Sequence, residues 1–283
     1  MFTQAIRAAV AVGLMTLFTN AWADPAEAED EAPEEEAAES AVSSPPMEMD
    51  DPGTPGSRGL EVNFVGSFDR VGDGRGAESL LDANYGIGDR IQLKYERPYV
   101  SEGTAGGETQ SGLGATELGV KWRFIERDGL EIAVYPNYPF DDGFTPTDEE
   151  GNPELSSGRS YYLPVLLSKT FHRVYSAAAN VGYRRNLENR GDDVNLALGL
   201  GRAIGGSSRL LAEVFSERDE HLTNRQTDVR AGYVILLFPQ WFEKSSFEVP
   251  LYASLGHSIG QTEEGESALS FAFGLSFILK PRH

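Results

Sequence analysis

Charged and apolar residues alternate in the stretch GLGATELGVKWRF, Gly112–Phe124. Glu117, Lys121 and Arg123 share one parity, and the other parity carries apolar side chains: Leu118, Val120, Trp122 and Phe124. Because successive side chains of a strand point to opposite faces, such a strand has one charged face and one apolar face. On an enclosed face, these acids and bases would pair with each other or select passing solutes by charge and size.

The same pattern recurs along the chain and defines candidate residues for the interior of a barrel. They are Glu61, Asp82, Lys94, Glu96, Glu117, Lys121, Arg123, Glu131, Glu213 and Glu248. Two interpretations stay open. The charges pair as a structural filling, since buried charges need partners, or they form a selective constriction. The excess of carboxylates predicts that a pathway through them prefers cations or neutral solutes over anions.

The sequence indicates no catalytic residues, no metal site and no cofactor. His257 directly precedes Ser258, so on a strand these two side chains face opposite ways and cannot pair with each other. A barrel lipid hydrolase would need a histidine and a serine on one face, within hydrogen-bond reach. The absence of cysteine excludes disulfides and thiolate metal sites. The acidic stretch 141–158 lacks the oxygen spacing of an EF-hand.

Short alternating runs continue from Gly59 to the end of the chain. Each is close to the roughly 9–11 residues that a tilted strand needs to cross a bilayer. Their number, about twelve, is even, as in bacterial single-chain barrels. The predicted fold is therefore an all-β, transmembrane antiparallel β-barrel. The predicted strands are 59–68, 78–87, 90–99, 113–125, 129–139, 160–170, 173–184, 193–204, 208–217, 228–238, 247–257 and 267–279.

The links between these runs alternate between tight and long. The predicted long links are 69–77, 100–112, 140–159, 185–192, 218–227 and 258–266. Outer-membrane barrels have short periplasmic turns and long outer loops. Because the first predicted link is long, both ends of the barrel chain are expected on the periplasmic side.

One parity of the predicted strands is almost free of charge, as a lipid-facing wall requires. A charge at mid-bilayer costs roughly 2–4 kcal/mol. Two strands, 160–170 and 228–238, are apolar on both parities and would contact a plug, a partner subunit or an apolar substrate. The outward set in four other strands is Leu60, Val62, Phe64 and Phe68; Ile91, Leu93 and Tyr95; Val194, Leu196, Leu198 and Leu200; and Leu269, Phe271, Phe273, Leu275, Phe277 and Leu279.

The region before the barrel has two predicted parts. Residues 1–23 have the charge, apolar stretch and small-residue cleavage site of a secretory signal peptide. Residues 24–57 hold twelve carboxylates and no Lys or Arg, so we expect a disordered acidic periplasmic linker. This linker is either a solvated spacer or a tail that binds a cation or a basic partner. Residues 58–283 form the predicted barrel.

Two motifs carry a family resemblance. YGIGDRIQLKYERPY, Tyr85–Tyr99, followed by GLGATELGVKWRF, Gly112–Phe124, resembles the repeated pattern of the outer-membrane transporter family named after the meta-pathway of phenol degradation. The resemblance implies a monomeric outer-membrane β-barrel that passes hydrophobic or aromatic small molecules. Where this family often shows P-T-G after the next strand, the present chain has PNYPFDDG, Pro136–Gly143.

The functional hypothesis is a porin-like outer-membrane channel or transporter of a Gram-negative bacterium. Its solutes would be small and hydrophobic, aromatic or cationic, and its surroundings outer-membrane lipid and lipopolysaccharide. The alternatives are a non-conducting structural or partner-binding barrel, with a periplasmic partner for the acidic segment, and a lipid hydrolase. The net charge of −20 argues against nucleic-acid binding.

Overall fold

The computed structural model describes residues 47–104, 107–140, 143–144, 159–172, 174–187, 191–238, 247–259 and 268–280. The chain divides into Met1–Ala37 and Ala38–His283, and the described residues all belong to the second unit. The predicted signal peptide, the linker residues 24–46 and most of the acidic stretch 141–158 lie outside the described residues.

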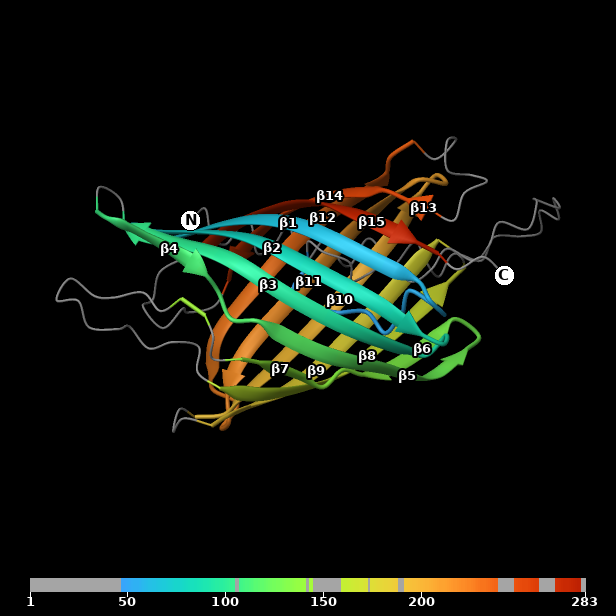
Figure 1. Cartoon of the computed structure of the whole chain (residues 1–283), viewed down its shortest axis with the longest axis horizontal. Coiled ribbons are helices and arrows are strands. Elements are labelled where there is room, and N and C mark those ends of the chain that lie inside the picture. The colour runs from blue at the N-terminus through green and yellow to red at the C-terminus, as the bar shows by residue number, and fades with distance from the viewer. Residues whose placement is uncertain are drawn as a thin grey trace. The chain divides into compact units, whose positions relative to one another are not determined.

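The strands run antiparallel and close into one ring (Figure 1). β1 pairs with both β2 and β15, which closes the barrel. The short strand β4 shares one position in the ring with β5, as do β6 with β7 and β13 with β14, so fifteen strands fill twelve positions. The bounds are β1 Leu60–Val71, β2 Gly74–Ile87, β3 Ile91–Thr104, β4 Thr109–Leu113, β5 Glu117–Arg127, β6 Leu130–Val134, β7 Asn137–Pro139, β8 Ser160–Phe171, β9 Tyr175–Asn186, β10 Asp193–Ile204, β11 Ser208–Asp219, β12 Asn224–Leu236, β13 Phe247–Glu248, β14 Pro250–Ser258 and β15 Ala268–Leu279.

The predicted barrel of twelve strands is confirmed. No helix among the described residues is long and apolar enough to cross a membrane.

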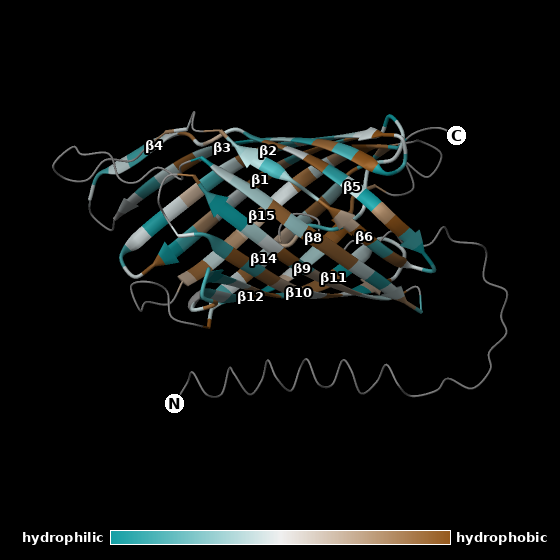
Figure 2. Cartoon of the chain, turned by 90° about the horizontal axis from the view of Figure 1, so that it is seen from below, coloured by the Kyte–Doolittle hydropathy of each residue, from teal (hydrophilic) through white to brown (hydrophobic). Residues whose placement is uncertain are grey.

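The outer wall is apolar, as the parity of the strands predicted. Figure 2 shows hydrophobic and hydrophilic residues alternating along the wall strands. On β10 the side chain of Leu198 is 67% exposed, whereas its neighbour Ala197 is 4% exposed and points inward. Phe271 and Phe273 of β15 are likewise exposed on the outside. The alternation thus gives a belt able to face hydrocarbon and an interior lined by small and polar residues.

Three of the predicted long links are wrong. Most of the range 100–112 is strand, because β3 continues to Thr104 and pairs with β4 from Thr109 onward. β1 continues to Val71 and β2 begins at Gly74, so the link is a tight turn in which Gly72 adopts a positive φ of 55°. β11 and β12 similarly leave only residues 220–223 between them. Polar residues such as Asp69 and Arg70 continue the ladder, because hydrogen-bond pairing does not require apolar side chains.

The wall is interrupted where β6 gives way to β7. Pro136 follows Tyr135 there, and Pro164 of β8 lies opposite and cannot donate to the ladder. Tyr135 donates its N–H to the Pro164 carbonyl at 3.1 Å, and its side chain is buried inside the barrel. Leu166 and Ala133 pack against it. One of the two strands that are apolar on both parities thus contributes an apolar patch to the interior.

Candidate functional site: the barrel lumen and the segment inside it

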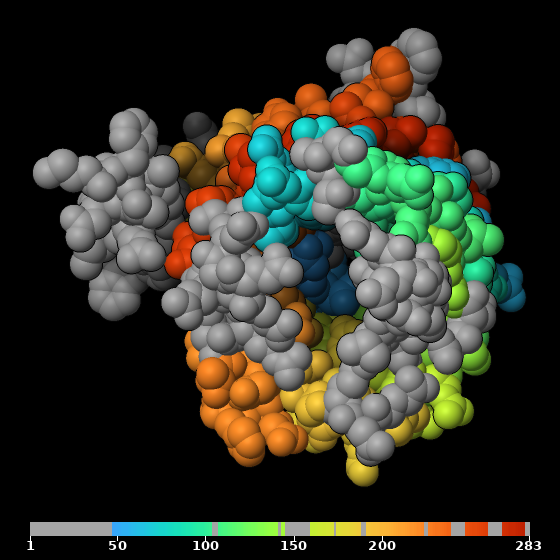
Figure 3. All heavy atoms as spheres, turned by 90° about the vertical axis from the view of Figure 1, so that its left-hand side faces the viewer, coloured from blue at the N-terminus to red at the C-terminus, as the bar shows by residue number. Residues whose placement is uncertain are grey.

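Residues 47–57, named here the lumenal segment, precede β1 and lie within the ring of strands. Figure 3 shows this dark-blue part of the chain inside the barrel, seen from one end. The segment enters at the end where β1 begins: Arg58 donates its N–H to the Gly86 carbonyl at 3.0 Å, and Thr54 Oγ1 donates to the Asp89 carbonyl at 2.9 Å. The expectation of a disordered periplasmic linker therefore does not describe residues 47–57.

Ion pairs hold the lumenal segment to the wall. Its carboxylates each face a cation on a different strand: Glu48 lies 2.6 Å from Arg230 of β12, Asp50 lies 3.6 Å from Lys94 of β3, and Asp51 lies 3.7 Å from Lys121 of β5. Strands β3 and β5 are neighbours in the ring, while β12 is separated from them by several strands on either side. The contacts therefore span the lumen from one side to the other.

Glu213 of β11 binds the backbone of the lumenal segment. Its carboxylate accepts the N–H of Glu48 at 3.1 Å and the N–H of Met49 at 2.9 Å. The side chain of Glu213 is only 2% exposed, so these charge-assisted bonds replace the water that it has lost. Met49 itself packs into an apolar recess of the wall formed by Ala178 and Ala197.

Other wall residues bind carbonyl groups of the segment. Asn180 Nδ2 donates to the Asp50 carbonyl at 2.9 Å, and Lys121 Nζ donates to the Gly53 carbonyl at 3.3 Å. The extended segment has no strand partner of its own, and buried backbone polar groups need partners. These side chains supply partners that a composition argument about residues 24–57 could not reveal.

Tyr135 lies between the two lysines that bind the segment. Lys94 Nζ and Lys121 Nζ stand 5.3 Å and 5.7 Å from the centre of its ring. Its hydroxyl donates to Glu117 Oε1 at 3.5 Å, and Lys94 also pairs with Glu96 at 2.7 Å. Four candidates on β3 and β5, Lys94, Glu96, Glu117 and Lys121, are thus brought together near one aromatic ring, and both lysines keep acidic partners.

The remaining candidates fall into separate groups. Arg123 pairs with Glu131, and Ser168 also donates to Glu131 at 3.2 Å. Glu248 lies apart from the lumenal segment, 34% exposed, and pairs with Lys280 at 3.0 Å. Glu61 and Asp82 belong to a buried hydrogen-bonded network with Asn63, Asn84, Gln92 and Ser276.

Arg230 and Asn180 bind the segment but were absent from the sequence-derived set, as was Tyr135, which lies beside Lys94 and Lys121. Arg230 and Asp228 are two residues apart on β12 and therefore point to the same face. The sequence contains this pair of charged residues, in a strand that was predicted to be apolar on both faces. Asn180 lies on β9 among alanines and carried no comparable signal.

His257 and Ser258 both bind the backbone of Ala268 on β15. His257 Nδ1 lies 2.9 Å from the Ala268 carbonyl, and Ser258 Oγ accepts the Ala268 N–H at 2.6 Å. These bonds fasten the end of β14 to its neighbour and account for both polar groups without a catalytic role.

Two glycines of the family-resemblance motifs leave room for the Tyr135 ring and for the lumenal segment. A side chain at Gly119 would overlap the Tyr135 ring, and a side chain at Gly86 would overlap the Gly56 carbonyl at the entry of the segment. Both residues belong to the two motifs that carry the family resemblance. The motifs therefore supply much of the wall around the base of the lumenal segment.

Replacing Gly86 by valine should displace the lumenal segment while leaving β2 intact. Valine suits a strand, but its side chain would occupy the position of the segment backbone. We expect limited proteinase K to cleave within residues 47–57 of Gly86→Val and to spare the native protein. Gly76→Val on the same strand is the matched control, because the nearest atom there is Asp69 Cβ at 3.8 Å. Equal protection of both variants would contradict the assigned path of the segment.

Asp51 makes the docking of the segment sensitive to pH. Burial raises its pKa from the ordinary value of 3.8 to about 7, although the neighbouring Lys121 ammonium acts in the opposite direction. Three nearby carboxylates raise it further: Glu61, Glu131 and Asp50. A raised pKa means that the docked segment binds this proton more tightly than the free segment does.

Docking of the segment should therefore weaken as the pH rises. The proton-linked contribution is complete below pH 3.8 and is lost as the pH rises through about 7. We expect proteolysis within residues 47–57 to become faster over this interval, after correction for the pH dependence of the protease on a reference peptide. Asp51→Asn should flatten the profile. A profile that is identical in Asp51→Asn and the native protein would contradict this assignment.

Comparison with solved structures gives similar barrels. The NanC porin has a TM-score of 0.55 at 11% identity, over 76% of this chain and 98% of that one. The COG4313 outer membrane channel from Pseudomonas putida F1 has a TM-score of 0.55 at 12% identity, over 78% and 94%. The KdgM porin in complex with disordered oligogalacturonate has a TM-score of 0.50 at 10% identity, over 79% and 99%.

No protein-family model and no curated protein matches the chain. The structural likenesses and the closed ring of twelve strand positions together show that this chain has the fold of outer-membrane β-barrel porins and channels.

Proposed function

We propose that the chain is a channel in the outer membrane of a Gram-negative bacterium that passes small solutes through its lumen. The supporting observation is the combination of an apolar outer wall with an interior of paired charges and amides. A barrel filled only for stability would gain little from ionic groups, because their desolvation offsets much of their attraction. Residues 1–23 would export the chain. The β1–β2 link is short, but the longer links from β7 to β8 and from β14 to β15 leave the same end of the barrel, which supports an outer position for that end and periplasmic chain ends.

The lumenal segment would control the width of this channel. Its contacts with β3, β5, β9, β11 and β12 reach across the lumen, so solutes meet it on their way through. These contacts are ion pairs and hydrogen bonds, which water and passing ions can replace. The segment is thus suited to be a removable plug, and its carboxylates Glu48, Asp50 and Asp51 match cations of the wall.

The charge of the lumen favours cations and neutral solutes over anions. Carboxylates outnumber cations among the ten candidate residues, and the lumenal segment adds Glu48, Asp50 and Asp51. A narrow passage of this sign concentrates cations and repels anions. The family resemblance implies an aromatic or hydrophobic solute, but the apolar cluster of Tyr135, Leu166 and Ala133 is at most 1% exposed and offers such a solute no surface.

Planar-bilayer recording in a gradient of potassium chloride tests the channel proposal. We expect discrete single-channel steps and a reversal potential displaced towards that of potassium. Selectivity for chloride would overturn the predicted solute charge. Absence of conductance both in the full chain and in a chain without residues 47–55 would instead support the non-conducting structural or partner-binding barrel.

A further inference from the structure

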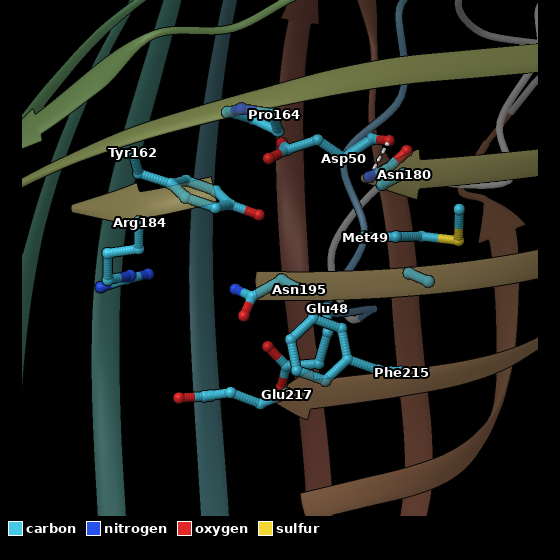
Figure 4. A pocket seen from close by; sticks show the side chains of 11 residues that line it. Glu48, Met49, Asp50, Tyr162, Pro164, Asn180, Arg184, Asn195, Phe215 and Glu217 are labelled. Atoms are coloured by element: carbon cyan, nitrogen blue, oxygen red, sulfur yellow. Dashed lines mark hydrogen bonds between the residues drawn. The ribbon is translucent and has the colours of Figure 1, made fainter. Parts of the chain in front are cut away.

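A cavity of about 220 Å³ lies between the lumenal segment and the wall formed by β8–β11 (Figure 4). The segment contributes Glu48, Met49 and Asp50 to its lining. At roughly 30 Å³ for each water molecule in the liquid, the volume equals about seven waters. The cavity is therefore large enough for a compound with a single ring. The wall contributes Tyr162, Asn180, Arg184, Asn195, Phe215 and Glu217, among others.

Two buried amide oxygens line this cavity without a hydrogen-bond donor. Asn180 and Asn195 are 7% and 8% exposed, and the Oδ1 atom of each has no hydrogen-bond partner. Asn180 Nδ2 donates to the Asp50 carbonyl, which fixes the direction of its amide. The Asn195 amide bonds to the Tyr162 side chain. The cavity thus offers oriented acceptors, which suit a ligand that carries donors.

The charge of the lining indicates the sign of that ligand. Glu48, Asp50 and Glu217 contribute three carboxylates. Glu48 and Asp50 also pair with Arg230 and Lys94, and the guanidinium of Arg184 in the lining lies 5.0 Å from the centre of the Tyr162 ring. With Glu217 and the two amide oxygens as further acceptors, a ligand that carries donors is favoured and a carboxylate ligand is disfavoured.

Aromatic faces complete the site. Figure 4 shows the rings of Tyr162 and Phe215 with the side chain of Asn195 between them. Such faces attract both the apolar body of a ligand and an ammonium group. We propose that this cavity binds a small organic ammonium compound with an aromatic or apolar body. Its ammonium donates to the oxygens of Asn180 and Asn195. This inference rests on the proposed channel only in placing the cavity on a solute pathway, since binding itself requires no transport.

Ligand-observed NMR titration of the purified full chain in detergent tests the proposal with three probes. Benzylamine is the cation, benzyl alcohol its neutral counterpart and benzoate its anionic counterpart. We expect benzylamine to bind most tightly and benzoate most weakly. Asn195→Leu should weaken benzylamine roughly tenfold, the effect of losing one hydrogen bond to a charged group. Asn137→Leu is the matched control, since Asn137 Oδ1 is also buried without a partner and Asn137 does not line the cavity.

Benzyl alcohol or benzoate binding as tightly as benzylamine would overturn the proposal, as would an equal affinity in Asn195→Leu and Asn137→Leu. The comparison of probes uses the native chain, so it stands even if a variant fails to fold. A negative titration alongside normal conductance would refute the ammonium site and leave the channel intact. Selective binding without conductance would refute the channel and leave the site.

Discussion

Deleting residues 47–55 should raise the single-channel conductance several-fold. The deletion removes all three ion pairs and both backbone bonds to Glu213, which span the lumen between β3 and β12. It retains Gly56 and the turn into β1, in which Gly59 donates to the Gly56 carbonyl at 3.0 Å. Because the ring of strands closes through β1 and β15, the barrel itself should remain intact.

A replacement of the same residues by a glycine–serine stretch of equal length provides the matched control. It preserves chain length but removes the carboxylates, so we expect frequent opening. Heat-modifiable migration on a gel would establish that both variants form the barrel. If folded barrels without the segment conduct no better than the full chain, residues 47–57 do not limit the passage.

Substituting Glu213 by leucine should release the segment without shortening it. The change removes the carboxylate oxygens that accept the Glu48 and Met49 N–H groups. A hydrogen bond to a charged group contributes about 1.5–3 kcal/mol, so loss of even one should raise the undocked population roughly tenfold or more. Recordings should therefore show longer open periods, with an open-level conductance close to that of the deletion variant.

Glu248→Gln is the appropriate control for Glu213→Leu. It also removes a carboxylate from the sequence-derived set, but Glu248 pairs with Lys280 and lies apart from the segment. We expect its gating to match the native protein. Equal gating in Glu213→Leu and Glu248→Gln would show that the bonds from Glu213 do not hold the segment in place.

The wall of the barrel could be predicted from the sequence because the side on which each residue lies depends only on its position in its own strand. A residue next to lipid must be apolar and its neighbour faces the other way, so parity assigns both faces at once. Ala197 and Leu198 illustrate this, since they are adjacent and differ from 4% to 67% in exposure. The first link, 69–77, was predicted wrongly because strand pairing continues beyond the apolar belt, where Asp69 and Arg70 still form ladder bonds.

The lumenal segment could not be predicted in the same way. Residues 47–57 are rich in Pro and Gly and bury little apolar surface apart from Met49 and Pro52, so their composition resembles that of a disordered chain. What orders them is a set of partners far away in the sequence, such as Glu213 and Arg230. Long-range complementarity of charge leaves no periodic signal. Likewise, the need for a glycine at position 86 can be recognised only once the path of the segment beside it is known.

The most direct test of the segment's position uses the absence of cysteine from the chain. Met49 packs against Ala197, whereas the next residue, Leu198, points outward. The pair Met49→Cys and Ala197→Cys should form a disulfide on mild oxidation, lock the channel in its low-conductance state and release it on reduction. The pair Met49→Cys and Leu198→Cys should remain reduced. No cross-link at Ala197, or equal cross-linking at both positions, would contradict a segment docked inside the barrel.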